Sequence, residues 1–264
     1  MNQEAQESRL GNFTSSAIVA LLSMGKVKMS EEELKARPKS GTGSSTTLKD
    51  GGLGEAALTY IKTRNWERKA GRSMSQDVWS KETAWGKLLE PRVMELLGTS
   101  YIPTGTDVAI PHPLYPFWKG SPDGRKFNLS VAEKVAEIKA PFTLNSFFTF
   151  ADCDTIEDVR KNHTDGEKYY WQVVSNACIL GLDKAELIIY CPYEDELIEI
   201  RKAAEFCDDI DTQKWIERCN PRSLPYLIRG KQYSNLKIFS FDVPQSDKDR
   251  LTERVIEASQ FLIK

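Results

Sequence analysis

The stretch from Gly120 to Phe142 constrains this chain most, because it joins a turn signal to a strand that carries opposite charges. It begins Gly-Ser-Pro-Asp-Gly and ends Val-Ala-Glu-Ile-Lys-Ala-Pro-Phe. Side chains alternate along a strand, so Glu137 and Lys139 are expected on one face and their neighbours on the other. Asp123 lies ahead of that strand. Two carboxylates and one ammonium at the open end of a hairpin predict a divalent-metal site that activates water.

Each half of this stretch also has an ordinary structural explanation. Ser-Pro-Asp-Gly fits a reverse turn with proline at its second position and glycine at its fourth. Glu-Ile-Lys fits a strand with one face in solvent. Glu90 on an upstream helix and Gln172 on a downstream helix favour the functional interpretation, which is metal-dependent hydrolysis of phosphodiester bonds.

Apolar residues at helical spacing predict a helix from Lys81 to Gly98. Glu90 lies at the edge of its apolar stripe, where a buried carboxylate requires a partner or a metal. Glu90 also fits an ordinary acid on a helix surface. Pro91 removes one helical hydrogen bond, so the helix is expected either to kink or to restart there.

Hydroxyl residues near the start, Thr14 to Ser16, precede an apolar run and predict a short capped helix. The alternative is that these hydroxyls and the helix N-terminus, together with Arg9, hold a phosphate. Residues 38–54 are rich in glycine and are predicted to form a mobile loop. They lack the Gly-Lys-Ser/Thr ending of a P-loop, which argues against a nucleotide site.

A helix predicted from Glu55 to Lys69 carries the densest basic cluster of the chain. The cluster fits a solvated helix face or a strip that meets phosphates. Its members are Lys62, Arg64, Arg68, Lys69 and Arg72.

Composition is that of an ordinary globular protein, with 264 residues of which 40% are hydrophobic and 28% charged. A net charge of −2 argues against a general nucleic-acid coat, so any DNA contact is expected from a local patch. The five cysteines form no CxxC pair and are predicted to be reduced thiols rather than a metal cage. His112 and His163 lie far apart, which argues against a Ser-His-Asp triad.

The remaining pattern alternates strands and helices, with a polar, irregular segment over residues 145–168 that fits a short helix and a loop. The other predicted elements are strands at 107–110, 185–192 and 237–243, helices at 169–181 and 251–263, and an acid-rich helical region at 194–219. No apolar run is long enough to span a bilayer, and residues 1–9 lack a signal pattern, so a cytoplasmic protein is predicted.

Taken together, these landmarks resemble the PD-(D/E)XK nuclease superfamily, and within it the phage lambda exonuclease and YqaJ-like viral recombinase family. The matching segments, in family order, are Arg9-Leu-Gly, Thr14-Ser-Ser16, Ala84-Trp-Gly-Lys-Leu-Leu-Glu90, Ser121-Pro-Asp-Gly124, Glu137-Ile-Lys-Ala-Pro-Phe142 and Gln172. Ala140 stands where the family usually has cysteine. The resemblance implies an α/β fold with a restriction-endonuclease-like core, in which helices flank a mixed central sheet.

The resemblance also implies a role for each site residue. Asp123 and Glu137 would bind the principal Mg²⁺, or Mn²⁺ in its place, with the Ile138 carbonyl as a further ligand. Glu90 would complete a second metal position. Lys139 would orient and help deprotonate the attacking water, with a pKa lowered by the nearby cations.

By the same resemblance, Gln172 would support the site from its helix. Arg9, Ser16 and Ser121 would lie where the family holds the terminal phosphate of its DNA. The chain is expected to be a single nuclease domain, residues 1–264, with a core at about 9–192 and an extension of unclear role at 193–264.

The implied activity is a processive 5′→3′ exonuclease that degrades double-stranded DNA from a free end during phage-type recombination in a bacterial host. The family further implies a ring-shaped homotrimer that cooperates with a single-strand annealing protein. Two alternatives stay open: an endonuclease of the same superfamily, of restriction or repair type, and a DNA-binding or assembly module without turnover.

Overall fold

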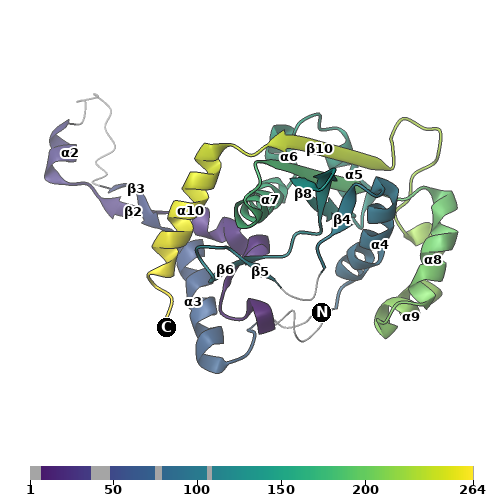
Figure 1. The fold of residues 1–264 in the computed structure, drawn as a ribbon, viewed down its shortest axis with the longest axis horizontal. Coiled ribbons are helices and arrows are strands. Elements are labelled where there is room, and N and C mark those ends of the chain that lie inside the picture. The colour runs from purple at the N-terminus through teal and green to yellow at the C-terminus, as the bar shows by residue number, and fades with distance from the viewer. Residues whose placement is uncertain (1–6, 37–47, 75–78, 106–108, 264) are drawn as a thin grey trace.

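The computed structural model describes residues 7–36, 48–74, 79–105 and 109–263 (Figure 1). Most of the glycine-rich segment therefore lies outside the described residues, as does the start of the strand expected at 107–110. Residues 48–53 are not a loop, because they form β3 (Leu48–Leu53) and pair antiparallel with β2 (Met24–Lys28).

A mixed five-stranded sheet forms the centre of the molecule, in the order β10-β9-β8-β7-β4. Strands β8 and β9 run parallel, and the other neighbouring pairs are antiparallel. The strands are β4 (Tyr101–Pro103), β7 (Gly124–Asn128), β8 (Val131–Lys139), β9 (Lys184–Tyr190) and β10 (Leu236–Asp242). The expected α/β class with a mixed central sheet is confirmed.

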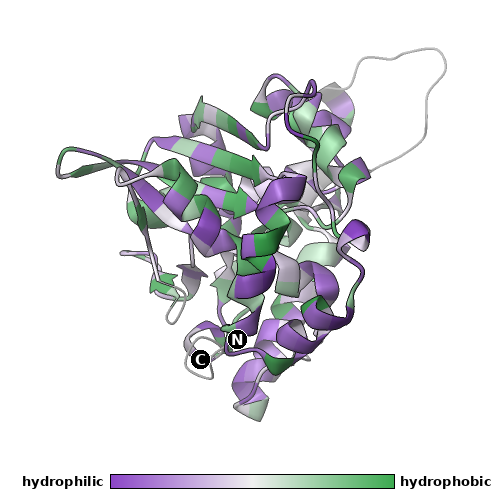
Figure 2. Ribbon diagram, turned by 90° about the vertical axis from the view of Figure 1, so that its right-hand side faces the viewer, coloured by the Kyte–Doolittle hydropathy of each residue, from purple (hydrophilic) through white to green (hydrophobic). Residues whose placement is uncertain are grey.

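Helices cover both faces of this sheet, and strand alternation decides which residue meets which helix. On one face, Val135 packs in a hydrophobic cluster with residues of α7 (Gly166–Leu180). On the other, Ala136 and Ile138 pack with residues of α4 (Lys81–Leu97). Hydrophilic and hydrophobic residues alternate along the peripheral helices in Figure 2, as expected for helices with one buried face.

Helix α4 is continuous through Pro91, so the restart considered from the sequence does not occur. The Ser80 hydroxyl caps its start by accepting a hydrogen bond from Thr83 N at 3.1 Å. Pro91 is exposed, and the helix ends before Gly98, as the sequence predicted.

The C-terminal region belongs to the central architecture. Strand β10 adds the outer antiparallel strand beside β9. Helix α10 (Gln245–Ser259) places Leu251 and Val255 in the same hydrophobic cluster as α7 residues. It begins at Gln245, six residues before the predicted start at Leu251. Residues 193–264 thus complete the sheet and one of its covering layers.

Other segments complete the frame around the sheet. The segment 145–168 is more regular than expected, because it contains two helices, α5 and α6. The remaining elements are β1 (Phe13–Thr14), η1 (Ser15–Leu22), α2 (Glu31–Ala36), α3 (Glu55–Ala70), β5 (Ile110–Pro111), β6 (Trp118–Gly120), α5 (Leu144–Ala151), α6 (Ile156–Asn162), η2 (Glu194–Glu196), α8 (Leu197–Glu205), α9 (Ile210–Arg218) and η3 (Pro221–Ser223). Among the described residues, no helix combines the length and apolar character needed to cross a bilayer.

Candidate active site

A cavity of about 600 Å³ opens at the end of β8 and brings together residues from distant parts of the chain. Glu90 from α4, Asp123 from the turn before β7, and Lys139 from β8 all line it. Ile138 lines it as well. Four of the predicted site residues therefore share one cavity.

Glu137 is buried beside that cavity, with 1% of its surface exposed. Its Oε1 accepts hydrogen bonds from Lys139 Nζ at 2.7 Å and from Gln172 Nε2. Its Oε2 accepts a hydrogen bond from Asn176 Nδ2 at 3.1 Å. Gln172 and Asn176 are four residues apart on α7 and so share one face of the helix. Together they hold both carboxylate oxygens of Glu137 from one side.

Asp123 connects the turn to the strand that carries the other charges. Its Oδ2 accepts a hydrogen bond from the Ile138 backbone N–H at 2.6 Å. The next residue, Gly124, lies against α4, because an added Cβ would be 2.3 Å from Met94 Cε. A side chain at this position would require the flexible end of Met94, on the helix that carries Glu90, to move. Ser-Pro-Asp-Gly has a bend at Asp123 that leads into β7 and positions a carboxylate.

The three acids are close together, and the pKa of each is raised. Burial and the Asp123 charge raise the pKa of Glu90 to about 7. Burial, with Asp123 and Glu90, raises the pKa of Glu137 to about 8. Burial likewise raises the pKa of Asp123. A cation beside these groups would favour their charged forms.

The pKa of Lys139 depends on the acids beside it. Burial by itself would lower the pKa of Lys139, but the Glu137 and Asp123 charges hold that pKa above its ordinary value. Its Nζ also lies 5.1 Å from the centre of the Tyr169 ring. Beside these acids the side chain is a protonated ammonium at neutral pH, and the lowering of its pKa by nearby cations stays a prediction.

The donor set is of the kind that Mg²⁺ prefers, namely carboxylate and carbonyl oxygens next to solvent. Among the described residues, no group of three or more His, Cys, Asp or Glu side chains is arranged so that it could hold a metal as it stands. Glu137 faces the amides of α7 rather than lining the cavity. The residues fit a divalent cation because their oxygens are suitable ligands, and because a cation would relieve the repulsion between the neighbouring carboxylates.

The three residues predicted to hold a phosphate lie on segments that neighbour one another. Strands β1 and β6 are parallel neighbours in which Thr14 pairs with Lys119, so Ser16 and Ser121 each follow that pair by two residues. Lys119 Nζ donates to the Ser8 carbonyl at 2.6 Å, which brings the segment before Arg9 to the same strands. Within the described residues, none of the three predicted phosphate ligands lines the cavity of the acids.

The predicted phosphate ligands also differ in environment. Ser16 is exposed. The Ser121 hydroxyl is buried and has no hydrogen-bond partner among the described residues. Burial lowers the pKa of Arg9. The unpartnered Ser121 hydroxyl is the feature here that best fits a polar ligand.

Asn176, Tyr169 and Lys119 were not singled out from the sequence. Asn176 is the most informative, since it contacts the same carboxylate as Gln172. Its position four residues after Gln172 is the only local signal that points to it. Tyr169 lines the cavity and lies one helical turn before Gln172.

Two arginines of the basic cluster on α3 serve the fold. Arg64 forms an ion pair with the buried Glu67 at 2.9 Å. Arg68 donates to the carbonyls of Gly11 at 2.7 Å and Ile263 at 2.6 Å. Arg64 is therefore paired within its own helix and Arg68 joins separate segments, so neither belongs to a free phosphate-binding strip.

The fold is that of solved exonucleases, as the sequence landmarks led us to expect. LHK-Exo in complex with dAMP matches with a TM-score of 0.53 and 15% identity, covering 98% of this chain and 92% of that chain. The alkaline exonuclease LHK-Exo from Laribacter hongkongensis matches with a TM-score of 0.52 and 16% identity, covering 98% and 90%.

A phage-related exonuclease from Haemophilus somnus 129PT matches with a TM-score of 0.52 and 13% identity, covering 95% of this chain and 92% of that chain. A scan against models of protein families and a search of curated proteins found no match. At these identities the likeness establishes the fold, and the activity has to be argued from the site.

Proposed function

We propose that this protein is a metal-dependent deoxyribonuclease that acts as an exonuclease on linear double-stranded DNA. The observation that carries the proposal is the gathering of Glu90, Asp123, Glu137 and Lys139 at the end of β8, on a fold shared with exonucleases. Acids in excess of their neighbouring cation suit a divalent metal, which would in turn accept an oxygen of the phosphodiester.

Asp123, Glu137 and the Ile138 carbonyl would hold Mg²⁺, or Mn²⁺ in its place, and Glu90 would complete a second position. When bound, the metal supplies Lewis acidity and lowers the pKa of coordinated water. Gln172 supports this role, because its amide fixes the orientation of the Glu137 carboxylate.

Lys139 carries its proton in the metal-free site, where Glu137 and Asp123 favour the ammonium. As an ammonium, Lys139 donates hydrogen bonds that orient water and offset negative charge on the scissile phosphate. The same side chain acts as a base only after its pKa has fallen, which nearby cations favour.

The finer parts of the proposal concern the DNA end. Arg9, Ser16 and Ser121 would receive its terminal phosphate, supported by the unpartnered Ser121 hydroxyl. The proposed polarity is 5′→3′. The proposed setting is phage-type recombination in a bacterial cytoplasm, with a homotrimer around the duplex and a single-strand annealing protein as partner.

Linear duplexes labelled separately at each end, with and without a 5′ phosphate, test the proposal. We expect Mg²⁺-dependent release of nucleotides from 5′ ends, faster with the phosphate, and no release in EDTA. Efficient cutting of covalently closed circles would favour the endonuclease alternative. Intact linear duplex with either Mg²⁺ or Mn²⁺ would favour the non-catalytic module.

A further inference from the structure

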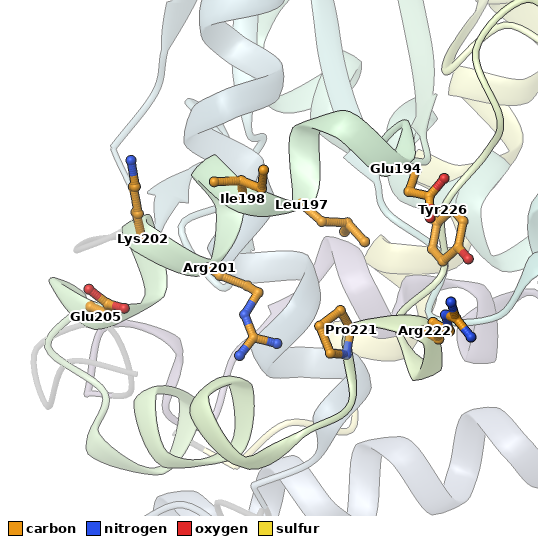
Figure 3. A pocket seen from close by; sticks show the side chains of 9 residues that line it. All are labelled: Glu194, Leu197, Ile198, Arg201, Lys202, Glu205, Pro221, Arg222 and Tyr226. Atoms are coloured by element: carbon orange, nitrogen blue, oxygen red, sulfur yellow. The ribbon is translucent and has the colours of Figure 1, made fainter.

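A second cavity, of about 580 Å³, lies on the C-terminal helices (Figure 3). It shares no lining residue with the cavity of the acids, as far as the described residues show. We call it the α8 groove, because most of its lining comes from α8 and the rest from η2, η3 and one following residue. Its lining residues are Glu194, Leu197, Ile198, Arg201, Lys202, Glu205, Pro221, Arg222 and Tyr226.

The middle of the α8 groove is apolar. Leu197 is buried, whereas Ile198 on the same helix is 65% exposed. Pro221 and Tyr226 face them from η3 and the segment after it (Figure 3). Groups of this kind favour a ligand with apolar side chains, and the volume is that of a site for a few such side chains.

Three cationic side chains border this apolar floor: Arg201, Lys202 and Arg222. Arg201 donates to the carbonyls of Cys219 at 3.2 Å and Glu217 at 3.4 Å, which leaves its charge uncompensated. Within the described part of the chain, none of the three forms an ion pair with a carboxylate.

Three acids next to the groove form ion pairs with arginines that lie outside it. Arg92 of α4 pairs with Glu196 at 3.0 Å and Glu199 at 3.1 Å. Arg229 pairs with Asp195 at 2.9 Å. These three acids next to the groove are therefore compensated, and the three cations inside it are not.

Glu194 and Glu205 lie toward opposite ends of the α8 groove in Figure 3. Each would repel a run of phosphates along the groove, which disfavours nucleic acid as the occupant. A short peptide can place a carboxylate near Arg201, which lies between the two glutamates in Figure 3. The Arg92 pairs also tie α8 and η2 to α4, the helix of Glu90.

We propose that the α8 groove binds a short segment of a partner protein in which adjacent apolar residues are flanked by aspartate or glutamate. The apolar side chains pack on Leu197, Ile198 and Pro221, and the carboxylates meet Arg201 and Arg222. The interaction does not depend on the nuclease activity, because the groove contains none of the residues assigned to it.

Selection of a random peptide library displayed on phage against the full chain tests this inference. We expect the enriched peptides to share apolar pairs flanked by acids. Their synthetic, fluorescently labelled copies should bind with a Kd on the order of micromolar by anisotropy and more weakly at high salt. Ile198→Glu and Arg222→Glu should each weaken binding about tenfold or more.

The matched control is Lys214→Glu, the same kind of charge reversal at an exposed position of α9 outside the groove. It should change the Kd by less than about twofold. Circular dichroism melts verify folding, and all variants should still degrade linear duplex if the proposed nuclease activity holds.

Enrichment of basic peptides, or of none, overturns the inference, and so does binding that both groove variants retain. A short DNA duplex that displaces the peptide from wild type would assign the groove to nucleic acid instead. Loss of duplex degradation by wild type would refute the proposed function and leave the peptide result standing.

Discussion

Asn176→Ala is the most specific test of how the candidate active site holds the Glu137 carboxylate. It removes one amide donor, at 3.1 Å from Glu137 Oε2, and leaves Lys139 and Gln172 on Oε1. Hydrogen bonds to charged groups contribute about 1.5–3 kcal/mol. Residues that orient metal ligands typically contribute about 10–100-fold in metal affinity or activity.

Stability should change less than metal binding. The Asn176 Oδ1 is buried and has no hydrogen-bond partner among the described residues. Removing Asn176 removes this unsatisfied oxygen together with the useful donor, so the two effects partly cancel. We therefore expect the free energy of unfolding to fall by only about 1 kcal/mol in the metal-free protein.

The assay is a Mn²⁺ titration of the metal-free protein followed by electron paramagnetic resonance, with kcat and KM measured on linear duplex. Asn176→Ala should weaken Mn²⁺ binding about 10–100-fold and lower kcat with little change in KM for DNA. Ser175→Ala is the matched control, because Ser175 is buried on the same helix but bonds Ser15 and Trp118 instead of Glu137. Mn²⁺ affinity equal to wild type in Asn176→Ala would refute the reasoning, since Asn176 would then not be holding the carboxylate.

Three further predictions concern charge in the fold and the site. Lys139→Ala should reduce cleavage by about a hundredfold or more while Mn²⁺ binding persists, and undiminished cleavage would remove Lys139 from the mechanism. The pKa of Glu90 is raised to about 7 and that of Glu137 to about 8. At a pH above 4.5, the ordinary pKa of a glutamate, the native state therefore binds more protons than the unfolded chain. Stability of the metal-free protein should therefore fall as the pH rises from about 5 to about 8, and Mg²⁺ should lessen the fall. Thermal midpoints in EDTA and in Mg²⁺ check this, and a midpoint that rises with pH in EDTA contradicts it. Tyr101→Phe removes the donor at 2.6 Å from the buried Glu186 and should destabilise the protein by about 1.5–3 kcal/mol in urea unfolding. Tyr233→Phe, whose partner is at the surface, should leave the midpoint unchanged, and equal effects of the two would count against the buried bond.

Tyr101 also shows how the central sheet is held together at its other end. Lys134 Nζ donates to Glu186 Oε1 at 2.8 Å, while the Tyr101 hydroxyl donates to Oε2 of the same carboxylate. These contacts join β4, β8 and β9. The network lowers the pKa of Glu186 against the opposing effect of burial, which is the opposite of what happens to Glu137. Two buried glutamates in one sheet thus differ because their neighbours differ in charge.

Local pattern determined much of this protein. Alternation along β8 was enough to predict that Glu137 and Lys139 lie on the face opposite Ala136 and Ile138, since side-chain direction depends only on the strand period. Helical periodicity with a glycine stop likewise predicted α4 and α7. The family landmarks predicted the fold that the solved exonucleases share.

Only the tertiary structure decided how the charges behave. Glu137 meets Gln172 and Asn176 across 35 and 39 residues of sequence, and Asp123 meets Ile138 across 15. The role of Arg68, which joins Gly11 and Ile263, and the effect of the Asp123 charge on the pKa of Lys139 arise from contacts of this kind. A short window of sequence states which face a side chain occupies. The burial of that side chain and the charges around it depend on which distant elements pack against the face. Burial and neighbouring charges then determine the protonation of the side chain and its hydrogen-bond partners.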